Sequence, residues 1–130
     1  MEQLTDQFQK TVGSMLIRHQ SILDILSKST ESSARVNRAV VKSVTSCGCH
    51  AIHARKKNIP ADASLTDLKE LLDSQLEGEI CVNCQEIVEA ELGKHLFYIA
   101  ALANTMDISL SGVLVKENRK LNTLRAFNMT

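Results

Sequence analysis

The stretch EIVEAELGKHLFYIAALANTMDISLSGVLVKENR, residues 86–119, decides the fold of this chain. Apolar residues recur through it at intervals of three and four, the spacing that places them on one face of an α-helix. A short break around Asp107 separates two such patterns, and Asp107 or Ser109 can cap the second. The second pattern contains several basic side chains near its end, which suits the negative end of a helix dipole. This segment therefore predicts two consecutive helices.

The rest of the chain shows the same periodicity. One proline and five glycines leave few breakers in 130 residues, so long helices are expected. The polar run at residues 27–33, SKSTESS, is rich in capping residues and predicts a boundary between two helices. The sequence Ser64-Leu65-Thr66-Asp67 resembles a capping box and predicts the start of a short helix. The expected helices cover about residues 3–28, 31–55, 64–72, 78–104 and 109–124.

Composition restricts the fold class. Apolar residues make up 44% of the chain and aromatic residues only 3%, so the core must be built mainly from aliphatic side chains, which suits packed helices. A chain of 130 residues is expected to form one domain, here residues 1–130. We therefore expect an all-α, antiparallel bundle of about five helices without a β-sheet.

Charge and hydropathy disfavour two classes of partner. Fifteen basic and fifteen acidic side chains cancel, whereas a nucleic-acid-binding protein usually carries a basic excess. No apolar run approaches the roughly 18 residues that would span a bilayer, and the polar N-terminus does not resemble a signal peptide. We expect a cytoplasmic protein that binds neither membranes nor nucleic acid. Its cysteines should then be thiols or metal ligands rather than disulfides.

Glu91-Leu92-Gly93, the apolar run that follows, the short break and the helix carrying Asn118 and Arg119 resemble a known family. The pattern is similar to the C-terminal half of the MazG-like, all-α nucleoside triphosphate pyrophosphohydrolases. The resemblance implies a MazG-like bundle completed by a second subunit, hence a homodimer. It also implies a nucleotide or small-molecule ligand near Asn118 and Arg119, where the family has an Asn-Arg pair close to the phosphates. The helix dipole explains basic residues near a helix end equally well.

The resemblance covers roughly residues 34–120 and also implies a magnesium site, most of which is missing here. The family places Glu-x-x-Glu on one helix and Glu-x-x-Asp on a later one, because positions i and i+3 share a face and magnesium takes oxygen ligands. Ser46 and Cys49 stand where the first helix would carry its glutamates. On the later helix Glu91 is retained, and Lys94 replaces the aspartate. Because a cation repels magnesium, the resemblance implies a relative without hydrolase activity.

A shifted set of acids is the alternative. Glu86 and Glu89 form another i, i+3 pair, which with Glu91 could supply magnesium ligands to an active nucleoside triphosphate pyrophosphohydrolase. The same spacing is common on solvated helix faces. The two functions differ in whether three or more carboxylates converge on one cavity.

The four cysteines occur in two close pairs, Cys47-Gly48-Cys49 and Cys81-Val82-Asn83-Cys84. The two-residue gap of the second pair lets both sulfurs reach one zinc ion. On a continuous helix the first pair would point about 200° apart, so both can bind one metal only if the helix bends or ends near Gly48. The insertion at about residues 56–84 has few apolar anchors, and zinc would hold it in place.

Other interpretations of the cysteines stay open. Cys49 and His53 are at positions i and i+4 and could join Cys81 and Cys84 in a zinc site of three cysteines and one histidine. Reduced thiols are also common buried side chains without a metal. A redox pair lacks the expected βαβ context, and CxC is not a usual spacing for an iron–sulfur cluster. The favoured prediction is a non-catalytic binding or structural module with zinc on Cys47, Cys49, Cys81 and Cys84.

Overall fold

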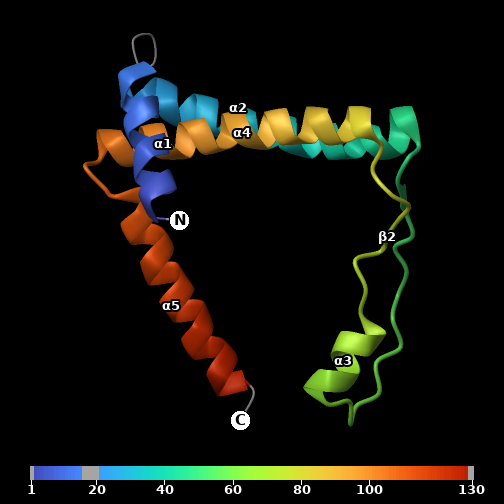
Figure 1. Cartoon of the computed structure of the whole chain (residues 1–130). Helices are drawn as coiled ribbons and strands as arrows, with labels where there is room; N and C mark the ends of the chain where they lie inside the picture. Colours follow the sequence, from blue (N-terminus) through green and yellow to red (C-terminus); the bar gives the residue numbers. More distant parts are fainter. Residues whose placement is uncertain (1, 16–20, 129–130) are drawn as a thin grey trace. The chain divides into compact units, whose positions relative to one another are not determined.

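The computed structural model of the chain describes residues 2–15 and 21–128, with side chains described as far as residue 125 (Figure 1). These ranges contain the α-helices α1 (Glu2–Met15), α2 (Ile22–Lys42), α3 (Leu65–Leu71), α4 (Val82–Thr105) and α5 (Leu110–Asn128). A π-helix, η1 (Ser43–Cys47), continues α2, and two short strands, β1 (Ala51–Ile52) and β2 (Leu76–Glu77), follow. The all-α class expected from the sequence is confirmed.

The expectation of a chain without any β-sheet is wrong in one place. β1 and β2 form an antiparallel pair of two residues each. Gln75 and Gly78, directly before and after β2, have positive φ angles of 61° and 90°. All four strand residues are exposed, so this pair lies outside the core and the molecule remains a helical protein.

The helix boundary expected at residues 27–33 is also wrong, because α2 runs through this segment. Its hydroxyl groups donate to carbonyl oxygens of the preceding turn, from Ser27 to Leu23, from Thr30 to Leu26 and from Ser32 to Ser29. Serine and threonine are therefore accommodated inside the helix instead of capping one. Residues 16–20, which the expected first helix also covered, lie outside the described residues.

The helix expected to reach residue 55 ends earlier. α2 passes into η1, which ends at Cys47 and is followed by Gly48, whose φ of 81° is left-handed. Glycine adopts this conformation without the steric cost that a Cβ atom imposes, which makes it a common helix terminator. In contrast, the expected capping box is confirmed, because Ser64 and Asp67 exchange side-chain and backbone hydrogen bonds at the start of α3.

Contacts divide the chain into two compact units. The terminal unit comprises the described parts of Met1–Arg35 and Glu91–Thr130, and the central unit comprises Val36–Ala90. The buried core of the terminal unit consists of Val12, Ile25, Ala100 and Ala101, with Phe8, Phe97, Leu102 and Leu110 packed against it.

In the terminal unit α2 and α4 lie side by side and run antiparallel (Figure 1). Ile25 shares the core with Ala100 and Ala101, and seven residues later along α2 the Ser32 hydroxyl lies 2.8 Å from Nδ1 of His95. Toward the C-terminus of α2, the contacting residues on α4 therefore lie closer to the N-terminus of α4. The expected antiparallel packing of these two segments is present in this unit.

Gln9 on α1 forms two side-chain hydrogen bonds with the backbone between α4 and α5. Its Nε2 donates to the carbonyl of Ile108 at 2.7 Å, and its Oε1 accepts from the backbone N–H of Leu110 at 2.8 Å. Asn104 donates to the Gln9 carbonyl at 3.0 Å. Gln9 therefore satisfies one of the N–H groups that the first turn of α5 cannot pair within the helix.

No single helix among the described residues is long and apolar enough to cross a bilayer. α4 and α5 reach that threshold only together, as a pair bent by 106° at the break between them.

Candidate metal centre

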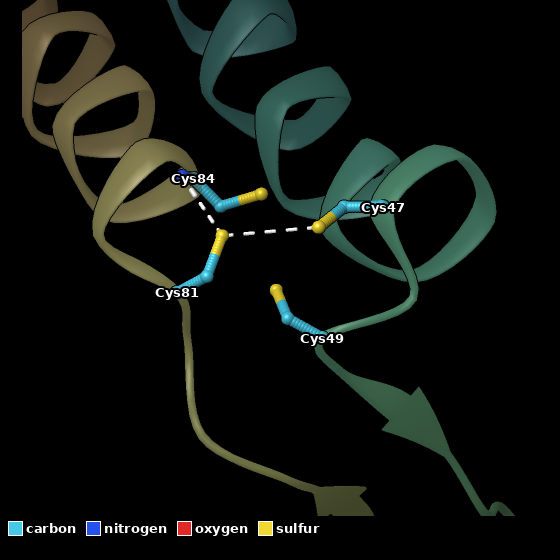
Figure 2. A group of neighbouring side chains, drawn as sticks. All are labelled: Cys47, Cys49, Cys81 and Cys84. Atoms are coloured by element: carbon cyan, nitrogen blue, oxygen red, sulfur yellow. Dashed lines mark hydrogen bonds between the residues drawn. The ribbon is translucent and has the colours of Figure 1, made fainter.

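Four cysteine side chains converge in the central unit (Figure 2). Their sulfur atoms all lie within 4.8 Å of one another, and none of them forms a disulfide. Cys47 ends η1 and Cys49 follows it, whereas Cys81 directly precedes α4 and Cys84 lies in its first turn. The structure therefore brings together the two pairs that the sequence singled out. They lie at the two ends of a long connecting segment, residues 48–83, which we call the excursion.

The end of the helix at Gly48 lets the first pair share one site. The Ser43 carbonyl accepts the N–H groups of Gly48 at 3.0 Å and of His50 at 3.2 Å, so the chain folds back on the last turn. The Cys49 thiol lies 3.6 Å from the same carbonyl. This is the condition under which Cys47 and Cys49 can approach one metal, because they no longer occupy opposite faces of a continuous helix.

The second pair is arranged by the N-terminus of α4. The backbone N–H of Cys84 donates to the sulfur of Cys81 at 3.3 Å. N–H groups at a helix N-terminus stabilise a thiolate. The pKa of Cys81 is accordingly lowered to about 7, first by the N–H of Cys84 and next by the Cys84 thiol. Cys81 thus ionises more readily than an ordinary thiol near neutral pH.

Cys84 shows the opposite shift, because it keeps the proton that Cys81 loses. Its side chain is buried, at 7% exposure. Its pKa is raised to about 12, first by the hydrogen bond with Cys81 and then by burial. Cys81 and Cys84 therefore readily share one negative charge, and a cation among the sulfurs would favour ionisation of both thiols.

The sulfur spacing matches that of a tetrahedral metal site. The sulfurs of Cys47 and Cys81 lie 3.8 Å apart (Figure 2). Metal–sulfur bonds of about 2.3 Å in a regular tetrahedron separate neighbouring sulfurs by about 3.8 Å. A disulfide would instead need a separation of about 2.05 Å. The four thiols can therefore serve one ion as a closed set of ligands.

His53, the alternative fourth ligand, has other contacts. Its Nε2 lies 3.3 Å from a carboxylate oxygen of Glu77, across the pair of short strands. Because η1 ends at Cys47, Cys49 and His53 do not share a helix face. His50 is also engaged, with Nδ1 3.0 Å from the Ser43 hydroxyl. The helical basis for a site with three cysteines and one histidine is therefore absent.

Gly78 allows the returning chain to pass close to the cysteines. A Cβ atom at this position would collide with the carbonyl oxygen of Cys49, and its φ of 90° is left-handed. Only glycine meets both requirements. Earlier in the same segment, Lys57 donates to the carboxylate of Asp73 at 3.0 Å, and this hydrogen bond is the first cause that lowers the pKa of Asp73.

The carboxylates of the alternative site do not form such a group. Glu86 is exposed, and Glu89 is exposed and accepts a hydrogen bond from Gln85 at 2.9 Å. Glu91 belongs to the terminal unit, where one of its oxygens lies 3.7 Å from Nζ of Lys94. Within residues 2–15 and 21–128, the four cysteines are the one group of three or more metal-ligating side chains.

The other residues suggested by the resemblance are exposed. Ser46 lies on η1, and Asn118 and Arg119 lie on α5. Asn118 borders a largely apolar cavity of about 550 Å³ between α1 and α5, whereas Arg119 does not line it. The structure therefore does not draw Asn118 and Arg119 into one basic site.

A second group of charged residues was missed by the sequence. A cavity of about 270 Å³ in the terminal unit is lined by Lys28, Glu31, Ser32, Arg35, Lys94 and Tyr98. The expected helix boundary at residues 27–33 had placed Lys28 and Arg35 on different helices. Their spacing along one helix was the signal that could have revealed this cavity.

Comparison of the chain with known protein families, curated proteins and solved structures gave no match.

Proposed function

We propose that Cys47, Cys49, Cys81 and Cys84 bind one structural zinc ion in a non-catalytic helical module with a binding or structural role. The observation that carries this proposal is the gathering of four unpaired thiols within 4.8 Å. Four cysteine ligands complete the coordination of zinc, whereas catalytic zinc sites keep one position open for water or substrate. The ligand set therefore favours a structural ion.

The excursion between the two cysteine pairs gives this ion a role. No side chain from residue 48 to residue 83 is buried, and several large apolar side chains there are exposed. Burial of apolar surface therefore contributes little to holding this segment. Structural zinc in small domains contributes about 10–16 kcal/mol at neutral pH, enough to replace a core. A zinc ion would close the excursion at its base.

The electrostatics of the thiols also support a cation. Zinc binds cysteine as thiolate and displaces the thiol protons. Cys81 already ionises near pH 7, and the N–H of Cys84 that donates to its sulfur would go on stabilising it as a ligand. A reducing cytoplasm, the compartment we propose, would keep the four thiols available for the metal.

The contacts of the remaining acids support a non-catalytic role. Magnesium around a triphosphate needs several oxygen ligands that face one point. Glu91 is instead paired with Lys94, and Glu89 is hydrogen-bonded to Gln85. The alternative of an active MazG-like pyrophosphohydrolase with magnesium on Glu86, Glu89 and Glu91 has less support from these contacts.

We also propose that the module is a homodimer. Large apolar side chains remain about half exposed on α5, among them Val113, Leu114, Leu121 and Leu124. Monomeric proteins rarely expose large contiguous apolar surfaces, and most soluble oligomers are symmetric dimers. The mass in solution, measured by light scattering, is expected to be about twice that of the chain.

Metal analysis of protein purified without added metals tests the zinc centre. We expect about one zinc per chain and no visible colour. Cys81→Ser should abolish stoichiometric zinc, whereas the matched variant His53→Gln should retain it. Iron with visible absorption would indicate a cluster instead. Four thiols that titrate freely in the absence of metal would contradict the proposal.

An assay of pyrophosphate release tests the catalytic alternative. Each common nucleoside triphosphate would be incubated with the protein and with magnesium or manganese. We expect no turnover above that of buffer, because the acids do not converge. Turnover that disappears in Glu91→Gln would establish the active enzyme in place of the non-catalytic module.

A further inference from the structure

The cavity of about 270 Å³ in the terminal unit carries an excess of positive charge. Three cationic side chains, Lys28, Arg35 and Lys94, line it together with one carboxylate, that of Glu31. The chain as a whole has no net charge, so this is a local concentration of cations. Such a cavity attracts anions.

Glu31 does not use all the hydrogen-bond donors of its two cationic partners, Lys28 and Arg35. Its Oε2 accepts from Lys28 at 3.2 Å, and its Oε1 accepts from Nε and Nη2 of Arg35 at 3.2 and 3.0 Å. These bonds, first those of Arg35, lower the pKa of Glu31 and keep it ionised. A guanidinium carries five N–H donors and an ammonium three, so one carboxylate does not exhaust either group.

Lys94 supplies the third cation from the opposite helix. Its Nζ lies 3.7 Å from Glu91, beyond the usual length of an N–H···O hydrogen bond. Its side chain is 62% exposed, whereas that of Glu91 is 17% exposed. The ammonium of Lys94 can therefore reach an acceptor in the cavity without leaving the neighbourhood of Glu91.

Ser32 forms a fixed polar wall of the cavity. It is 3% exposed, and its Oγ lies 2.9 Å from the Ser29 carbonyl and 2.8 Å from Nδ1 of His95. The Ser32 hydroxyl is therefore held between a carbonyl of its own helix and an imidazole of α4. This contact joins α2, which carries Lys28 and Arg35, to α4, which carries Lys94.

We propose that this cavity binds the phosphoryl group of a small phosphorylated metabolite, held chiefly by Arg35 and Lys94 and assisted by Lys28. The fork of N–H groups on arginine matches phosphate oxygens, and lysine adds a point charge. The volume is slightly below the roughly 300–1,000 Å³ of pockets for drug-sized ligands. It therefore suits a phosphoryl group on a small carrier and not a whole nucleoside triphosphate.

This inference deepens the binding role proposed above and rests on it, but it uses no cysteine. Isothermal titration with inorganic phosphate, a sugar phosphate and a nucleoside monophosphate tests it at low ionic strength. We expect saturable binding of one equivalent per chain, with the tightest of the three probes identifying the carrier. Arg35→Gln and Lys94→Gln should each weaken binding by about tenfold or more, because each removes charge-assisted hydrogen bonds.

Glu31→Gln provides the sharpest variant, because it should strengthen phosphate binding. It removes the carboxylate that competes for Lys28 and Arg35 and leaves their positive charge in place. A variant that merely damaged the fold would weaken binding instead. Arg125→Gln on α5 is the matched control, since it removes an exposed cation that does not line the cavity and should leave the affinity unchanged.

Absence of saturable binding would overturn the inference. So would weaker binding in Glu31→Gln, or a loss in Arg125→Gln as large as that in Arg35→Gln. Zinc content measured on the same samples separates this outcome from failure of the metal centre. Phosphate binding without zinc would refute the metal centre alone, and zinc without phosphate binding would refute the cavity alone.

Discussion

The terminal and central units are held together in different ways. The terminal unit buries Val12, Ile25, Ala100 and Ala101 in a common core. The central unit buries only Ala39, Ser43 and Cys84, all at the helical base of the excursion and none within it. The terminal unit is thus stabilised by packing, whereas the excursion has no buried core and, under the proposed zinc site, would be held by side-chain ligands.

The physical reason is the amount of apolar surface that each region can cover. Helices with one apolar face can pack on one another, and each fully buried aliphatic side chain contributes about 1.5–3 kcal/mol. The excursion has short strands and one short helix, which cannot bury a shared core. Linking its two ends offsets the conformational entropy of a long loop without requiring such a core.

Removal of the proposed zinc ion should have the largest effect and should affect one region. With a strong chelator at neutral pH, trypsin is expected to cut the excursion at Arg55, Lys56, Lys57 or Lys69, because metal loss removes its main constraint. Basic sites within α2 should stay protected by packing. Limited proteolysis followed by mass spectrometry measures both, and restored zinc should restore protection. Equal cleavage with and without chelator would break the comparison.

A substitution that creates a cavity in the core of the terminal unit tests whether packing stabilises this unit. Ile25 is fully buried, so Ile25→Ala should lower the free energy of unfolding by about 2–5 kcal/mol. Leu23 on the same helix is 73% exposed, and Leu23→Ala should change the free energy of unfolding by less than about 0.5 kcal/mol. Thermal and denaturant unfolding measure the difference. Zinc content should stay the same in both variants, and its loss in Ile25→Ala would show that the two regions are not stabilised independently.

The sequence predicted the regular helices better than it predicted their interruptions. The predicted ranges of α4 and α5 agree with the structure to within a few residues, because no proline interrupts either segment. The short helix α3 was located from Ser64 and Asp67, which combine into a recognisable cap. These features are local, so the sequence contains them.

The misplaced boundary at residues 27–33 had a physical cause. Serine and threonine can cap a helix or donate to a carbonyl of the preceding turn, and the residue type does not distinguish the two. Ser27, Thr30 and Ser32 donate to carbonyls of the preceding turn and do not cap a helix. The error split Lys28 from Arg35 and so concealed the basic cavity, which needs both on one helix beside Lys94.

The sequence could indicate which four cysteines belong to the cluster, but it could not show that all four meet in space. The spacing of Cys81 and Cys84 pointed to a shared ligand role. Whether Cys47 and Cys49 could join them depended on a helix end at Gly48, and a single glycine predicts such an end only weakly. The structure places that end there, with η1 stopping at Cys47.

Gly78 offers a smaller test of the central unit. Gly78→Ala would place a Cβ atom against the carbonyl of Cys49 and strain a left-handed residue, at a cost of about 1–3 kcal/mol. Zinc affinity, measured by competition with a chelating dye, should fall correspondingly. Gly93→Ala is the matched control, because nothing lies within 4 Å of its Cβ position inside α4. That variant should gain about 0.5–1 kcal/mol, and a similar loss in both variants would count against the close approach at Gly78.

The smallest expected effect is local to α3. Ser64 accepts from the backbone N–H of Asp67 at 3.1 Å, and Ser64→Ala should cost about 1 kcal/mol of helix stability. Amide hydrogen exchange should then quicken by about fivefold within α3, because a helix of this length is marginal without its cap. Thr66→Ala, on the same helix, keeps the cap and should not quicken exchange. Exchange elsewhere in the excursion and the zinc content should not change, because the proposed ion, rather than α3, holds its base. If quickened exchange spread from α3 to the cysteines, the central unit would be a cooperative structure like the terminal unit, and the contrast between packing and ligation would have to be abandoned.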